Sequence, residues 1–285
     1  MPIVDAHQHF WDPAANPYPW LTTAPIADFR YGDYSALRRP YLPDDYRRDT
    51  ARHEVVMTVH VEAEWDRGDE VGETRWLAAL RAAHGLPTVA VAHARLEDGA
   101  AGEVLAGHAA FDFVRGIRQK PAPGQMLDPR WRRGFALLER HGLSFDLQAP
   151  VDLLAEAADL ARAFPCTTIV VNHAGLPAER SAAGLRGWRK ALETVAAEPN
   201  VALKISGLGR PDHSWPMDDN ARLVREAVAI LGVGRCMFAS NFPVDSLCAA
   251  YDTVVATFAR GIADLPEADR RALWHDNAVR IYRIA

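Results

Sequence analysis

Residues 143–173 read LSFDLQAPVDLLAEAADLARAFPCTTIVVNH, and this stretch decides the fold. It contains two short strand-like runs, Leu143–Gln148 and Thr168–His173, on either side of Val151–Phe164, where apolar residues recur at helical spacing. A strand, a helix and a second strand in this order predict two parallel strands joined by a crossover helix, because a tight hairpin cannot connect parallel neighbours.

The same alternation repeats along the whole chain. Further strand-like runs are Ile3–His9, Val55–Glu62, Thr88–Arg95, Phe113–Gln119, Val201–Ser206 and Cys236–Asn241. Further helical patterns are Thr74–His84, Arg130–His141, Gly187–Ala197, Asn220–Leu231 and Ala250–Gly261. Eight units of about 30 residues account for the 285 residues, so the sequence predicts an α/β fold, a (β/α)8 TIM barrel that spans residues 1–285 as a single domain.

The interval after the first strand is longer than the others and differs in composition. It contains the loop Trp11–Tyr46, which is rich in Pro, Trp and Tyr. A loop of this length without regular structure is uncommon in a compact domain and is often a lid or a binding loop. The alternative is an aromatic cover that packs over the barrel and has no part in function. Both interpretations stay open at the level of the sequence.

The composition excludes several functional classes. The chain has 32 Lys and Arg against 37 Asp and Glu, a net charge of −5, so it lacks the basic surface that nucleic acid or an anionic membrane would need. No stretch resembles a signal-peptide core or a membrane span. The cysteines (Cys166, Cys236 and Cys248) form no CxxC pair, which favours reduced thiols. We expect a cytoplasmic protein that acts on a small molecule; the aromatic loop is also compatible with a homodimer.

Polar residues recur near the carboxyl end of every predicted strand. In one parity these residues are Asp5, His7, His9, His60, Glu62, His93, Arg95, Arg118, Asp146, Gln148, His173, Lys204, Ser206 and Asn241. The opposite parity is mainly apolar: Val4, Val59, Val61, Phe145, Leu147, Val170, Leu203 and Ile205. Because strand side chains alternate between the pore and the helices, we expect the polar set to converge on a cavity and the apolar set to face the helices.

His7 and His9 are the sharpest signal in the polar set. Residues at i and i+2 on a strand point the same way, so the two imidazoles can share a divalent ion or a substrate oxygen. His173, on the sixth predicted strand, can join them. The histidines in predicted loops and helix ends are expected to be solvated or to cap helices: His53, His84, His108, His141 and His275.

Several short motifs resemble the amidohydrolase superfamily. They are DAHQHFWD (5–12), HVEAEWD (60–66), ETRWL (73–77), VRGIR (114–118), NHAGLP (172–177), LKISGL (203–208), SNFPVD (240–245) and DNAVRIY (276–282). Their number and order are similar to those of the branch of metal-dependent TIM-barrel hydrolases that contains sugar-acid lactonases and 2-pyrone-4,6-dicarboxylate lactonase. The resemblance spans nearly the whole chain.

The resemblance implies a set of metal ligands. His7 and His9 match the histidine pair that binds metal or substrate in the superfamily, and His173 matches the histidine of the sixth strand. These three imply one divalent metal, zinc before manganese, although some lactonases of the branch work without metal. The fifth strand offers Asp146 and Gln148 in place of the lysine or histidine of binuclear members, which argues against a second ion.

The eighth strand departs from the pattern of the superfamily. Relatives place an aspartate there as metal ligand and general base, whereas this chain has Asn241, which cannot accept a catalytic proton. We therefore assign Asn241 and His173 to the catalytic group and consider Asp245 or Glu62 as the base. The alternative for Asp245 is a cap on the following helix.

The implied activity is the opening of a small lactone by water. Arg118 and Lys204 are the candidates for binding a carboxylate of an anionic substrate, with Glu62 and Trp20 beside them. Their alternative is an internal ion pair with Glu62 or Asp146. Two other functions stay open: a non-oxidative decarboxylase of the same superfamily, and a catalytically silent protein that binds sugar acids, which the asparagine at position 241 would suit.

Overall fold

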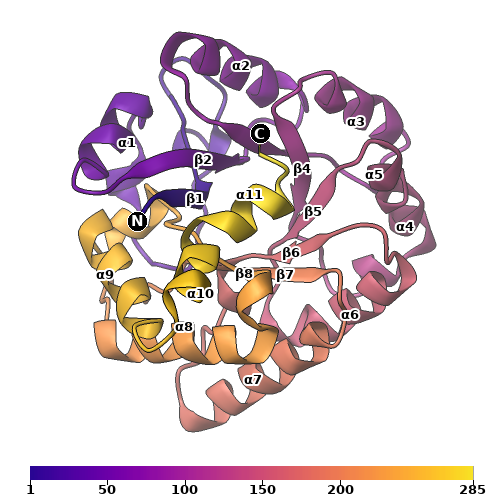
Figure 1. The fold of residues 1–285 in the computed structure, drawn as a ribbon. Helices are drawn as coiled ribbons and strands as arrows, with labels where there is room; N and C mark the ends of the chain where they lie inside the picture. The colour runs from indigo at the N-terminus through magenta and orange to yellow at the C-terminus, as the bar shows by residue number, and fades with distance from the viewer. Residues whose placement is uncertain (285) are drawn as a thin grey trace.

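The computed structural model describes residues 1–284, and within them eight parallel strands form one sheet in the order β1 to β8. The strands are β1 Ile3–Gln8, β2 Val55–Val61, β3 Val89–His93, β4 Val114–Gln119, β5 Ser144–Leu147, β6 Ile169–Val171, β7 Val201–Ile205 and β8 Cys236–Phe238. Helices surround the sheet, as Figure 1 shows. Every strand predicted from the sequence is present.

The helices follow the strands in the expected alternation. They are α1 Pro43–Asp49, α2 Gly72–His84, α3 Ala101–Ala109, α4 Pro129–Phe135, α5 Leu137–Arg140, α6 Leu154–Ala163, α7 Ala182–Ala196, α8 Met217–Leu231, α9 Tyr251–Gly261, α10 Glu267–Arg271 and α11 Asn277–Ile281. A π-helical turn, Ala272–Asp276, joins α10 to α11. No helix among residues 1–284 is long and apolar enough to cross a membrane.

The sheet closes where β1 meets the segment that follows β8. The amide of Asn241 donates to the carbonyl of His7 at 2.7 Å, and the amide of His9 donates to the carbonyl of Phe242 at 2.7 Å. The carboxylate of Asp5 accepts from the amide of Ser240 at 2.8 Å and from its hydroxyl at 2.5 Å. These bonds complete the predicted α/β barrel.

The barrel has two apolar cores, one between the strands and the helices and one in the pore. The predicted direction of the apolar strand residues is correct for only some of them. Phe145, Leu147, Leu203 and Ile205 face the helices as expected, in the core that contains the aromatic residues of α4. The second core fills the pore and consists of Val4, Ala6, Val59, Val61, Val89, Val91, Val170, Ala202, Met237 and Ala239, together with residues of α11. The assignment of Val4, Val59, Val61 and Val170 to the helix side was therefore wrong.

Two polar residues predicted to face the pore instead face the helices. The carboxylate of Asp5 accepts from the hydroxyls of Tyr46 and Tyr251, which belong to α1 and α9. His60 lies 3.5 Å from the carboxylate of Glu73, near the start of α2. The pairing of β1 with β2 shifts register between Asp5 and Gln8, and a strict alternation cannot continue through such a shift.

The C-terminal helix closes the end of the barrel where the strands begin. Figure 1 shows α11 crossing the middle of the barrel, and Ala278, Ile281 and Tyr282 pack against the apolar pore residues. The hydroxyl of Tyr282 donates to Asp146 at 2.9 Å. The sequence patterns gave no helix here, because a helix of five residues is too short to show an amphipathic period.

The long loop after β1 is more ordered than predicted. It contains two 3-10 turns, Pro19–Leu21 and Ser35–Leu37, and α1 already begins at Pro43. Its aromatic side chains are buried in the same core as the outer faces of the strands: Trp11, Tyr18, Trp20, Tyr31, Tyr34 and Tyr41. The aromatic cover is therefore present, while a role of the loop as a lid stays a prediction.

The prediction for His108 was also wrong. This residue is fully buried near the end of α3, a helix that the sequence reading missed because alanine and glycine occupy both of its faces. Its Nε2–H donates to the carbonyl of His93 at 2.8 Å, and its Nδ1 lies 2.9 Å from the hydroxyl of Thr74. Burial lowers the pKa of His108 from 6.5 to about 4.

His108 should make the protein sensitive to acid. Between pH 6.5 and about 4 the unfolded chain binds a proton at this histidine and the folded chain does not, so the free energy of unfolding falls as the pH falls. The shift corresponds to about 3 kcal/mol, lost mostly by pH 4. Urea unfolding of wild type and His108→Gln across this pH range should give a shallower slope for the variant; equal slopes would contradict the assignment.

Candidate active site

A cavity of about 240 Å³ opens at the carboxyl ends of the strands. His9, His173 and Asn241 line it from β1, β6 and β8, and Arg118 and Gln148 line it from β4 and β5. The long loop after β1 supplies Trp11, Trp20, Ile26, Asp28, Phe29 and Arg30. The cavity therefore lies where a parallel α/β barrel places its functional residues.

The three predicted histidines form one cluster. The Nε2 atoms of His7 and His9 are 3.2 Å apart, and the ring centroids of His7 and His173 are 4.7 Å apart. His9 donates through Nδ1 to the carbonyl of Val61 at 2.7 Å, so its Nε2 carries a lone pair. His173 is engaged at Nδ1 by the hydroxyl of Ser206 at 2.9 Å, which leaves its Nε2 for a ligand.

Asn241 completes the cluster from the eighth strand. Its backbone is left-handed, with φ of 57°, and its Nδ2 donates to Asp245 at 2.7 Å. This bond fixes the amide so that Oδ1 faces the Nε2 of His9 at 3.4 Å. Two lone-pair acceptors thus face each other at the wall of the cavity, an arrangement that needs a proton donor or a cation between them.

The histidines are neutral at ordinary pH. Burial lowers the pKa of His7, His9 and His173 well below the usual value, and nearby cations lower it further: Lys204 for His7, Arg118 for His9 and Arg30 for His173. A neutral imidazole is the form that binds metal and accepts protons.

The residues present fit one divalent cation. The acceptors that converge are imidazole nitrogen and amide oxygen, and zinc and manganese both accept such ligands. No group of three His, Cys, Asp or Glu side chains that could hold a metal ion occurs among residues 1–284. The three-histidine site remains a prediction.

Asp245 lies behind Asn241 and not at the cavity wall. It is fully buried, and its oxygens accept from the hydroxyl of Tyr31 at 2.7 Å, from Asn241 at 2.7 Å and from the amide of Gly207 at 3.0 Å. Burial raises its pKa, although these hydrogen bonds and Arg30 oppose the shift. The carboxylate therefore contacts the cavity only through its neighbours.

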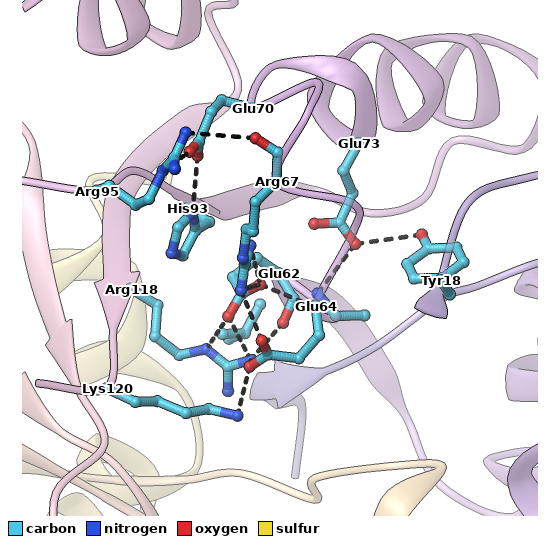
Figure 2. A network of polar contacts seen from close by, with 12 residues as sticks. Tyr18, Glu62, Glu64, Arg67, Glu70, Glu73, His93, Arg95, Arg118 and Lys120 are labelled. Atoms are coloured by element: carbon cyan, nitrogen blue, oxygen red, sulfur yellow. Dashed lines mark hydrogen bonds and ion pairs between the residues drawn. The ribbon is translucent and has the colours of Figure 1, made fainter. Parts of the chain in front are cut away.

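Glu62 and Arg118 form a buried ion pair, the alternative that the sequence left open. Arg118 donates from Nε to the carboxylate of Glu62 at 2.8 Å and from Nη1 to Gln148 at 3.2 Å. Burial alone would raise the pKa of Glu62, but Arg118 and Arg67 hold it well below its usual range. Figure 2 shows this pair inside a larger network, where Lys120 reaches Glu64.

Lys204 is paired in the same way, deeper in the barrel. Its Nζ lies 2.6 Å from Asp146 and 4.8 Å from the centre of the Tyr282 ring, and both charged side chains are fully buried. Unlike Arg118, Lys204 is not among the described residues that line the cavity. The structure therefore does not bring it to a position where it would touch a ligand.

Two cationic side chains that line the cavity, Arg30 and Lys120, were not predicted from the sequence. Arg30 belongs to the long loop, whose path no periodicity reveals, and Lys120 follows the last residue of β4. Trp20, which was predicted, does line the cavity, and its indole donates to the carbonyl of Ala63 at 2.8 Å.

Comparisons with known proteins agree with the barrel fold. The family model described as Amidohydrolase matches residues 4–284. An uncharacterised protein of Sinorhizobium fredii is 38% identical, covering 99% of this chain and 98% of that protein. An L-fucono-1,5-lactonase of Burkholderia multivorans is 28% identical, with 99% and 96% covered. Two crystal structures of an amidohydrolase from B. multivorans, one with bound HEPES and one with bound zinc, are each 27% identical, cover 100% of both chains and have TM-scores of 0.85 and 0.83.

The pairing of Lys204 predicts a stability defect when it is removed. Lys204→Met leaves Asp146 as an uncompensated buried charge and should lower the free energy of unfolding by about 3–5 kcal/mol. The double variant Asp146→Asn, Lys204→Met removes both charges and should recover much of that loss in urea unfolding. Equal losses in the two variants would show that the pair is not the cause.

Proposed function

The chain belongs to the amidohydrolase family. We propose that it is a hydrolase that opens a small lactone by attack of water on the ring carbonyl. The observation that carries the proposal is the pair of facing acceptors, Nε2 of His9 and Oδ1 of Asn241, at the wall of a cavity of about 240 Å³. The similarity to lactonases over nearly the full chain supports the same reaction type.

In this proposal His9 and Asn241 hold the attacking water. Both groups present lone pairs to the cavity, so the water donates its two hydrogens to them and directs its own lone pair at the carbonyl carbon. His173 lines the same cavity and offers Nε2 to the carbonyl oxygen. A divalent cation on His7, His9 and His173 would, when bound, polarise the carbonyl and lower the pKa of water.

In the metal-free protein we assign the proton of the water to Nε2 of His9, which returns it to the ring oxygen as the carbon–oxygen bond of the lactone breaks; a cation bound to this nitrogen would exclude that role. The carbonyl of Val61 already accepts from Nδ1 at 2.7 Å and favours the charged form of the ring, as does the carboxylate of Glu62. Asp245 and Glu62, the bases considered from the sequence, lie behind Asn241 and Arg118. Asp245 then acts as a positioning residue, because its bond to Nδ2 decides which end of the Asn241 amide faces His9.

The long loop fits a lid in this scheme. Trp11, Trp20 and Phe29 place apolar surface over the cavity, and exclusion of bulk water strengthens the polar interactions beneath.

Acid release from a panel of lactones tests the proposed function. Purified protein, with and without added zinc or manganese, is expected to open at least one member of a panel that contains neutral sugar lactones, L-fucono-1,5-lactone included, and carboxylated lactones. Carbon dioxide release from aromatic acids without lactone opening would favour the decarboxylase. Thermal stabilisation by sugar acids without any turnover would favour the silent binding protein.

His9→Asn tests the assignment of the base. Loss of a general base should lower kcat by about 10²- to 10⁴-fold. The matched control is His84→Gln, at the end of α2, which should retain wild-type kcat and melting temperature. A His9→Asn variant that folds and keeps its kcat would refute the assignment.

The double variant Asn241→Asp, Asp245→Asn separates an active enzyme from a silent one. It keeps a carboxylate–amide hydrogen bond in this place but moves the carboxylate to the side that faces His9. If the natural chain hydrolyses no lactone and the double variant does, the missing aspartate is the reason and the natural chain is a binding protein. We expect the natural chain to be active.

A further inference from the structure

Three cationic side chains line the cavity, and two of them are already neutralised. Arg118 pairs with Glu62 at 2.7 Å, and Lys120 pairs with Glu64. The third is Arg30, whose nearest carboxylate oxygen, on Asp245, is 3.9 Å away and so beyond hydrogen-bonding distance. The cavity therefore presents one guanidinium that makes no hydrogen bond to a carboxylate among residues 1–284.

Donors of Arg30 are left without an acceptor. Its Nη1 is buried and has no hydrogen-bond partner among the described residues. Asp245 does not supply one, because its nearest contact with the guanidinium is 3.9 Å, to Nη2. A buried donor without an acceptor costs about 1–3 kcal/mol, more when it is charged, so the described residues satisfy this guanidinium poorly.

The surroundings of Arg30 hold its guanidinium beside the histidine cluster. The group packs on the ring of Tyr31 at 4.5 Å from the centroid. Gly207, with φ of +65°, leaves the space that it needs: a Cβ at this position would lie 2.8 Å from Nη2 of Arg30 and 2.8 Å from Nδ1 of His173. Arg30 and His173 thus meet the ligand side by side.

We propose that Arg30 binds a carboxylate of the substrate, so that the lactone opened here carries a free carboxylate, as the lactones of sugar diacids do. The inference rests on the proposed function and names its substrate class. A carboxylate can accept hydrogen bonds from the part of the Arg30 guanidinium that lines the cavity, which neutralises its charge and fixes the ring relative to His173. A neutral aldonolactone leaves these donors unpaired.

The carboxylate of Asp28, which also lines the cavity, repels an anionic ligand. It is exposed on the same loop and lines the entrance. Its charge is screened by water, whereas that of Arg30 is partly sheltered, so the deeper cation dominates the selection. Asp28→Asn should therefore lower KM for the carboxylated lactone more than KM for the neutral one.

Matched substrates test the role of Arg30. The probes are D-glucaro-1,4-lactone and D-glucono-1,4-lactone, which share a ring and differ in the carboxylate. Arg30→Gln should lower kcat/KM for the first by about 10- to 100-fold and for the second by less than about 3-fold, as expected for loss of a charge-assisted hydrogen bond. Arg30→Lys keeps the positive charge but cannot form the bidentate hydrogen bond, so its kcat/KM for the carboxylated lactone should lie between those of wild type and Arg30→Gln. Arg39→Gln, an exposed arginine of the same loop, is the control.

Equal effects of Arg30→Gln on both lactones, or no effect on either, would overturn the proposal. Equilibrium binding of D-glucarate, measured by calorimetry, keeps the test independent of turnover. If wild type binds the diacid and Arg30→Gln does not, the anion site stands even where neither lactone is hydrolysed and the proposed function fails. If wild type hydrolyses only neutral lactones and does not bind D-glucarate, the proposed function stands and the role of Arg30 is wrong.

Discussion

The carboxylate of Asp5 holds together the seam on which the rest of the structure depends. It accepts from the amide and the hydroxyl of Ser240 and so ties β1 to the segment after β8, while Tyr46 and Tyr251 attach α1 and α9 to the same group. Burial raises the pKa of Asp5, and the hydrogen bonds from Ser240 oppose this shift. Because the seam continues through the backbone bonds between β1 and residues 241–242, it also sets the distance between His9 and Asn241. Closure of the barrel and assembly of the cavity are therefore the same event.

Beneath and beside the cavity, charge is neutralised in pairs. Lys204 with Asp146 and Arg118 with Glu62 each place a buried cation against a buried carboxylate, while desolvation and these nearby cations keep the histidines neutral. This leaves the imidazoles as acceptors and one guanidinium, that of Arg30, without a hydrogen-bonded carboxylate among the described residues. The polar interior is thus divided into groups that support the barrel and groups that face a ligand.

Much of the fold and part of the site could be predicted from the sequence. Strands such as Val201–Ile205 and helices such as α7 carry their own periodicity, and His7 and His9 converge because side chains two residues apart on a strand share a face. The direction of Asp5 could not be predicted, since the register shift in β1 comes from its pairing with β2. The short helix α11 and the placement of Arg30 depend on contacts between segments far apart in the chain, which local pattern does not encode.

The barrel and the histidine pair follow from the periodicity, spacing and residue types of the sequence, and the asparagine in the place of an aspartate follows from its resemblance to the superfamily. Only the tertiary structure decided which charges are free. From the sequence alone, Arg118 and Lys204 could each bind a ligand, but in the structure each pairs with a carboxylate from elsewhere in the barrel. Arg30 lies in a loop without any periodic pattern, and its contact with Tyr31 and the space above Gly207 place it at the cavity. The physical reason is that the availability of a charge depends on its nearest neighbours in space, and in a closed barrel those neighbours come from other strands.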